Sequence, residues 1–151
     1  MGVVFDVNVY LDYFLDENSD FPEIVGVPPL SENAAGDCLS LAFDAERFAL
    51  FASPHIFENI ARVLKLKNFD ARAVGMILEA VAEIVHLSGG SVVQPPRYAH
   101  ESKDFEDNLV LDLLKCTDSK VLVISDQGLL AMNPWKFRLI MEPRDFLEHI
   151  L

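Results

Sequence analysis

Short apolar runs alternate along this chain with stretches that have the periodicity of amphipathic helices. The clearest run covers residues 121–125 and is typical of a strand that is buried on both faces of a parallel sheet. Further strands are predicted over residues 3–7, 48–53, 92–93 and 137–141. Helices are predicted over residues 10–15, 31–46, 54–66, 71–86, 104–115, 128–132 and 143–151. This alternation predicts an α/β fold, a three-layer α/β/α domain with a central, mostly parallel, five-stranded sheet.

Several local signals mark where the predicted helices begin and where loops interrupt the pattern. Ser53 is a favoured N-cap and Pro54 a favoured first helical residue, and Asp70 is a candidate cap for the following helix. Residues 16–31 are rich in Asp, Asn, Ser, Gly and Pro, so they are predicted as a loop with at most one helical turn. That loop has three possible roles: a lid, a partner surface or an insertion.

The length and composition favour one globular domain over residues 1–151. The chain has 151 residues, of which 51% are hydrophobic, enough to build a sizeable core. Cys38 and Cys116 match no metal-ligand spacing and are expected to be buried reduced thiols. No signal-peptide pattern and no run long enough to cross a bilayer is present, so we expect a cytoplasmic protein without membrane association.

The chain is strongly acidic, with 24 Asp and Glu against 12 Lys and Arg and a formal charge of −12. This balance argues against broad, nonspecific nucleic-acid binding through a basic surface. It does not exclude a nuclease in which metal ions contact the phosphate, and it suits a partner that presents arginines. An acidic surface that serves only solubility is the alternative.

Two acids directly follow apolar strands, where ligands bind in open α/β sheets. Asp6 ends the first run, and Asp126 ends the run over residues 121–125. Each could be a simple turn aspartate, but the repeated position after a buried strand favours a function. Asn8 and Ser125 stand next to these acids and could orient a carboxylate or a bound water, or could satisfy backbone groups in a turn.

Three further acids lie near predicted helix starts. Glu58 lies one turn into its helix and could instead be a dipole-favoured acid paired with Arg62. Asp104 and Asp107 are three residues apart and can point the same way, or form an N-cap and its reciprocal partner. Glu106 is expected to face solvent.

A cluster of such acids would need a cation. Two carboxylates ~4 Å apart repel by roughly 4 kcal/mol at an effective dielectric near 20. Several together would become protonated unless a metal compensates their charge. Hard oxygen ligands favour Mg²⁺ or Mn²⁺, which bridge phosphates and activate water, so phosphodiester hydrolysis is the chemistry indicated.

Other candidate residues carry weaker signals. The four histidines show no paired ligand spacing and are expected at the surface or at helix ends: His55, His86, His100 and His149. Asp112 and Asp118 are predicted to be solvated surface charges. Three aromatic residues could stack on bases, although packing in the core or an interface is favoured for each: Tyr98, Trp135 and Phe137.

Taken in order, these motifs resemble the PIN domain family. The opening strand has the family pattern of an apolar run, Asp, any residue, and then Asn, Thr or Ser. The segments that resemble the four acidic motifs are residues 4–12, 53–64, 104–114 and 121–130, and residues 141–147 resemble the C-terminal strand-to-helix ending. Each motif is modest, but the ordered set covers nearly the whole chain.

The resemblance implies a Mg²⁺- or Mn²⁺-dependent endoribonuclease, often the toxin of a bacterial toxin–antitoxin pair of the VapC-like kind. It implies that the catalytic and metal-binding acids are Asp6, Glu58, Asp107 and Asp126, with Asp104 accessory and Asn8 and Ser125 supporting. An RNA substrate, an antitoxin protein that covers the acidic pocket, and a homodimer are the partners it implies.

Two other functions remain open at this point. A haloacid-dehalogenase-like phosphatase also begins with an acid after the first strand, but that chemistry requires Asp-x-Asp and Asn8 replaces the second acid. A non-catalytic acidic binding module, or a degenerate PIN domain that acts through protein partners, is favoured by the charge of −12 and the long early loop.

Overall fold

A parallel sheet of four strands lies at the centre of the computed structural model, which describes residues 1–16 and 32–151. The strands are β1 (Gly2–Phe5), β2 (Ala49–Phe51), β3 (Val121–Val123) and β4 (Leu139–Met141), in the spatial order β2-β1-β3-β4. All pairings are parallel, and Val3 of β1 lies opposite Leu50 on one side and Val121 on the other. β1 and β3 are therefore the central strands.

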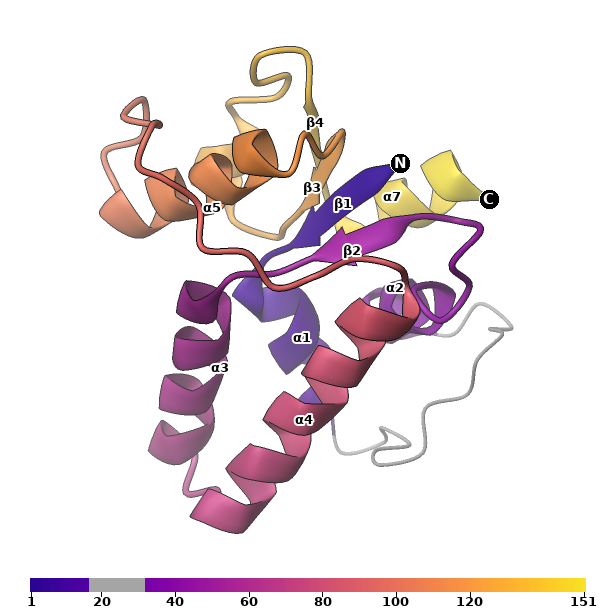
Figure 1. The fold of residues 1–151 in the computed structure, drawn as a ribbon, viewed down its shortest axis with the longest axis vertical. Helices are drawn as coiled ribbons and strands as arrows, with labels where there is room; N and C mark the ends of the chain where they lie inside the picture. The colour runs from indigo at the N-terminus through magenta and orange to yellow at the C-terminus, as the bar shows by residue number, and fades with distance from the viewer. Residues whose placement is uncertain (17–31) are drawn as a thin grey trace.

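Helices flank this sheet, so the predicted α/β class is confirmed. In the view of Figure 1, α5 lies to the left of the sheet, α7 lies to its right and contacts α2, and α3 and α4 run side by side below it. Their bounds are α1 (Val7–Phe14), α2 (Ala34–Leu41), α3 (Pro54–Leu66), α4 (Ala71–Leu87), α5 (Phe105–Cys116), α6 (Gln127–Leu130) and α7 (Pro143–Ile150).

An aromatic cluster fixes the carboxyl end of β1. Val3, Val4 and Phe5 are completely buried. The ring of Phe5 lies 5.8 Å from that of Phe48 and 5.9 Å from that of Phe146, both between centroids. Tilted and edge-on ring pairs of this kind each add ~0.5–1.5 kcal/mol beyond their buried area. The residue that follows Phe5 therefore starts from a rigid position.

The prediction of a five-stranded sheet is wrong by one strand, because the described residues form a sheet of four. Residues 92–93 form only an isolated parallel bridge between Ala52 and Val92, with the amide of Val93 donating to the carbonyl of Ala52 over 2.8 Å. The chain reaches this bridge through Gly90, where a Cβ would lie 1.8 Å from the carbonyl oxygen of Leu50. Residues 95 and 96 are prolines, which lack the amide that a longer ladder requires.

The first strand also ends earlier than predicted. Asp6 has the extended backbone of an N-cap, and α1 begins at Val7. The amide of Val9 donates to the carbonyl of Asp6 over 3.0 Å, so the helical turn begins directly after Asp6 and the strand cannot continue through residue 7. Asn8 is consequently a helical, exposed residue and does not share a strand face with Asp6.

The local helix-start signals are confirmed. The hydroxyl of Ser53 accepts a hydrogen bond from the amide of Ile56 over 3.3 Å, and the carboxylate of Asp70 accepts one from the amide of Ala73 over 2.8 Å. α2 is shorter than the predicted helix over residues 31–46. Most of the predicted loop over residues 16–31 lies outside the described residues.

Two compositional expectations can be compared with the structure. Cys38 is buried, but Cys116 at the end of α5 is exposed, contrary to the expectation for that residue. Within the described ranges, no helix combines the length and the apolar character that crossing a bilayer requires.

Candidate functional site

The carboxyl ends of the two central strands place Asp6 and Asp126 at the same edge of the sheet. The amide of Asp6 donates to the carbonyl of Val123, the last residue of β3, over 3.0 Å. Asp126 follows three residues later as the N-cap of α6, where its Oδ1 accepts a hydrogen bond from the amide of Leu129 over 3.2 Å. Both acids thus stand at the junction of a strand and a helix.

A third acid comes from the first turn of α5. Asp107 is partly buried, and its Oδ2 accepts a hydrogen bond from the hydroxyl of Ser102 over 3.2 Å. Asp104 is the exposed N-cap of the same helix, with its Oδ1 accepting from the amide of Glu106 over 2.9 Å. The helix start therefore concentrates three carboxylates within one turn.

The electrostatics connect these segments. The pKa of Asp6 is raised from 3.8 to about 6, chiefly by burial and to a smaller extent by the charges of Asp107, Asp126 and Glu106, against the lowering effect of a hydrogen bond from the backbone of Val7. Burial also raises the pKa of Asp107, followed by the charges of Asp104 and Asp126. Acids from three separate parts of the chain therefore repel one another at one edge of the sheet.

Glu58 is exposed and makes no hydrogen bond with this group within the described residues, so its membership of the site stays a prediction. Ile56, Ile60 and Leu64 form the buried face of α3, and Glu58 lies about 200° around the helix from Ile56, on the exposed side. It is not among the charges that most raise the pKa of Asp6 or Asp107. The expected pair with Arg62 does not form either, since that guanidinium donates to the side chain of Asn59.

The two supporting residues are both exposed. Asn8 lies in the first turn of α1, and Ser125 directly precedes the N-cap Asp126. Neither makes a side-chain hydrogen bond to the acids in the described part of the chain.

The donors fit a hard divalent cation in chemistry and charge. Burial and mutual repulsion raise the pKa values of these carboxyl groups. A bound Mg²⁺ or Mn²⁺ ion would offset the repulsion between their negative charges. The hydroxyl of Tyr10 is buried one turn after Asp6 and has no hydrogen-bond partner among the described residues. However, over residues 1–16 and 32–151 no group of three or more His, Cys, Asp or Glu side chains stands close enough to hold a metal.

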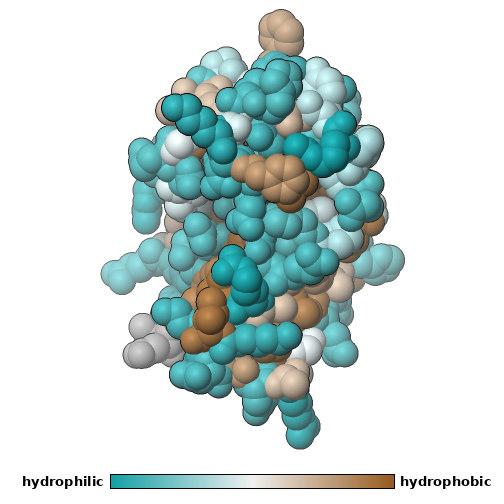
Figure 2. Space-filling model, turned by 90° about the vertical axis from the view of Figure 1, so that its left-hand side faces the viewer, coloured by the Kyte–Doolittle hydropathy of each residue, from teal (hydrophilic) through white to brown (hydrophobic). Residues whose placement is uncertain are grey.

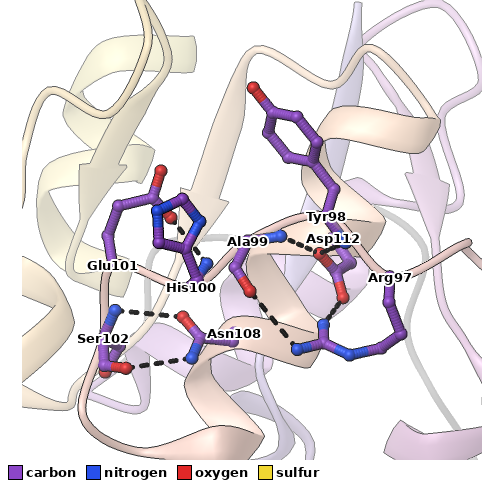
Figure 3. Close-up of polar contacts among 8 residues, drawn as sticks. All are labelled: Arg97, Tyr98, Ala99, His100, Glu101, Ser102, Asn108 and Asp112. Carbon is purple, nitrogen blue, oxygen red and sulfur yellow. Dashed lines mark hydrogen bonds and ion pairs between the residues drawn. The ribbon is translucent and has the colours of Figure 1, made fainter.

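Two buried polar side chains of α5 hold the preceding segment against the helix (Figure 3). Asn108 accepts a hydrogen bond from the amide of Ser102 over 3.0 Å and donates to its carbonyl over 2.9 Å. Because Ser102 in turn donates to Asp107, Asn108 indirectly fixes that carboxylate. These contacts make Asn108 and Ser102 positioning residues for the acidic edge.

The second anchor is Asp112, whose side chain is completely buried. It pairs with Arg97 and accepts from the amide of Tyr98 over 2.9 Å and from the amide of Ala99. The prediction that Asp112 is a solvated charge is therefore wrong. The available signal was its position: Asn108, Leu111 and Asp112 share the buried face of one helix, where an unpaired polar residue would be costly.

Comparison with known proteins identifies one relationship. A sequence model of the PIN domain matches residues 2–127, which is most of the chain and includes all four predicted acids. Comparison with curated proteins gave no match.

Proposed function

Because the chain belongs to the PIN domain family, whose members are generally nucleases that use divalent metals, we propose that it is a Mg²⁺- or Mn²⁺-dependent endoribonuclease. The observation that carries this proposal is the convergence of charge from Asp6, Asp107 and Asp126. Acids kept together at a cost in stability are typical of a functional site.

In this proposal Asp6, Asp107 and Asp126 hold the ion, and Asp104 is accessory. When bound, the ion would neutralise charge on the phosphodiester and promote attack by water. The chain's own groups keep the acids in place: Ser102 donates to Asp107, and the cap bond from the amide of Leu129 orients Asp126.

The test is RNA cleavage with Mg²⁺ or Mn²⁺ by purified protein. Asp6→Asn and Asp126→Asn should each lower the rate by at least about a hundredfold, because each removes a carboxylate ligand but keeps nearly the same side-chain shape. Asp70→Asn is the matched control, since it also neutralises an N-cap aspartate, at the start of α4. Metal-dependent cleavage that survives both site variants would reject the proposal.

Glu58 remains the predicted fourth acid. Glu58→Gln in the same assay tests whether Glu58 belongs to the metal site. If Glu58 is a ligand, this variant should lose RNA cleavage as Asp126→Asn does. Wild-type activity in Glu58→Gln would restrict the site to Asp6, Asp107 and Asp126.

We further propose that the nuclease is the toxin of a toxin–antitoxin pair, acting in the cytoplasm as a homodimer. The formal charge of −12 supports a basic partner that covers the acidic edge. Copurification with the product of a neighbouring gene, and loss of RNA cleavage in that complex, would support this role. Cleavage that the neighbouring gene product leaves unchanged would contradict it.

A non-catalytic binding module is the second candidate, favoured by the lack of a preformed three-acid metal group in the described ranges. An inert module should gain no stability from Mn²⁺, whereas a metal site should raise the melting temperature through binding to the folded state.

A further inference from the structure

The connection between β3 and β4 ends in a tight turn with an unusual sequence. Trp135 and Arg138 exchange backbone hydrogen bonds of 2.9 and 2.8 Å, and the two residues between them have positive φ, +47° at Lys136 and +68° at Phe137. Two central residues of positive φ define a type I′ turn, for which Asn-Gly is strongly preferred. A Lys-Phe pair there lowers stability, so its presence calls for a reason beyond folding.

The turn exposes Phe137 completely, while Trp135 on the same loop is buried. Trp135 therefore packs in the core as predicted, whereas Phe137 does not, and packing of Phe137 in an interface stays a prediction. Figure 2 shows one face of the molecule, which is mostly hydrophilic with a few hydrophobic groups at its surface.

Lysines gather beside this turn on the ring of Tyr98. The ammonium of Lys136 donates to the hydroxyl of Tyr98 over 2.6 Å and lies 4.3 Å from the centre of its ring. The ammonium of Lys115, from the last turn of α5, lies 3.3 Å from the same centre. Figure 3 shows Tyr98 pointing away from the Arg97–Asp112 pair, and the residue is exposed. We call Tyr98, Lys115, Lys136 and Phe137 the lysine–aromatic surface.

The charges of this surface are only partly compensated. Lys136 pairs with Glu101 over 3.3 Å, whereas Lys115 forms no ion pair with any described residue. The chain as a whole has a net charge of −12, so these adjacent lysines beside exposed rings form a locally basic surface on an acidic protein.

We propose that the lysine–aromatic surface binds single-stranded RNA, with its lysines on the phosphates and Phe137 and Tyr98 stacked on bases. Exposed rings next to cations are the combination by which proteins hold unpaired strands. The inference rests on the proposed ribonuclease function for its choice of ligand. α5 connects the surface with the acidic edge, since Lys115 follows Asp107 by eight residues, about 12 Å along the helix axis.

The test measures the affinity for a short, labelled, single-stranded RNA by fluorescence polarisation, with EDTA present so that no cleavage occurs. The double variant K136N/F137G should weaken binding by about tenfold or more through the lost charge and base stacking, yet melt at a higher temperature because Asn-Gly suits the turn. Lys115→Gln should reduce the slope of log affinity against log salt by about 0.7. The double variant K65Q/K67Q, on exposed residues at the far end of α3, should match the wild type.

Each outcome bears on a separate claim. RNA affinity that is unchanged in both K136N/F137G and Lys115→Gln would overturn the inference and leave the surface to a protein partner. Cleavage by the wild type with such unchanged binding would leave the proposed nuclease intact. Surface-dependent binding without metal-dependent cleavage would uphold the inference and reject the nuclease.

Discussion

Replacing Asp6 with Asn should make the protein more stable and less active, and the gain in stability should depend on pH. The pKa of Asp6 is about 6 in the folded protein, whereas its ordinary value is 3.8. At a pH between these two values, the carboxyl of Asp6 is protonated in the folded protein but ionised in the unfolded chain. Stability must therefore fall as pH rises from about 4 to about 6.

The size of the effect follows from the same two values. A difference of about 2 pH units corresponds to about 3 kcal/mol of lost stability once Asp6 is ionised, above about pH 6. Asn has nearly the same shape as Asp and carries no charge. Asp6→Asn should thus gain up to about 3 kcal/mol at pH 8 and nearly nothing at pH 4.

Urea unfolding of both proteins at about pH 4 and about pH 8 measures this difference. The Asp70→Asn variant controls for loss of an N-cap charge from an acidic chain, and its difference from wild type should change little with pH. If Asp6→Asn is no more stable than wild type at about pH 8, burial and the neighbouring acids do not raise the pKa of Asp6, and the electrostatic argument fails.

Three other substitutions test the contacts around the site. Asp112→Ala should lower the free energy of unfolding in urea by about 3–5 kcal/mol, because it leaves Arg97 and two backbone amides without their buried partner. The control Glu79→Ala, on an exposed helix face, should change it by no more than about 0.5 kcal/mol. Equal effects of the two substitutions would contradict the buried ion pair. Asn108→Ala should lower kcat for RNA by about 10- to 100-fold by releasing Ser102, and an unchanged kcat would remove its positioning role. Ser88→Ala should cost about 1–3 kcal/mol, because its buried hydroxyl accepts from the amide of Leu50 over 2.8 Å; stability equal to wild type would contradict this.

Features set by neighbouring residues were predictable from the sequence. Ser53 and Asp70 cap helices because a cap needs only the next three residues, and the apolar runs that form β1 and β3 need only burial on both faces. The parallel sheet and the strand-end positions of Asp6 and Asp126 follow from those runs.

Features that depend on distant segments were not predictable in this way. Asp112 shares the buried face of α5, but only the structure identifies its partners Arg97, Tyr98 and Ala99. The close approach of Gly90 to Leu50 of β2 likewise depends on a distant segment, and no local pattern reveals it.

The exposure of Glu58 depends on which residues of α3 bury the core face, and its motif does not reveal them. Its role in the site stays a prediction. Phe137 is similar, since an aromatic residue beside a strand ordinarily packs, and only the turn geometry exposes it.

Calorimetric titration of Mn²⁺ into the wild type and the Asp126→Asn variant tests most directly whether strand-end and helix-start acids form one cation site. The wild type and Asp70→Asn should bind Mn²⁺ alike, and Asp126→Asn should lose most of that binding. Equal binding by all three proteins would show that the acids at this edge of the sheet do not hold the ion.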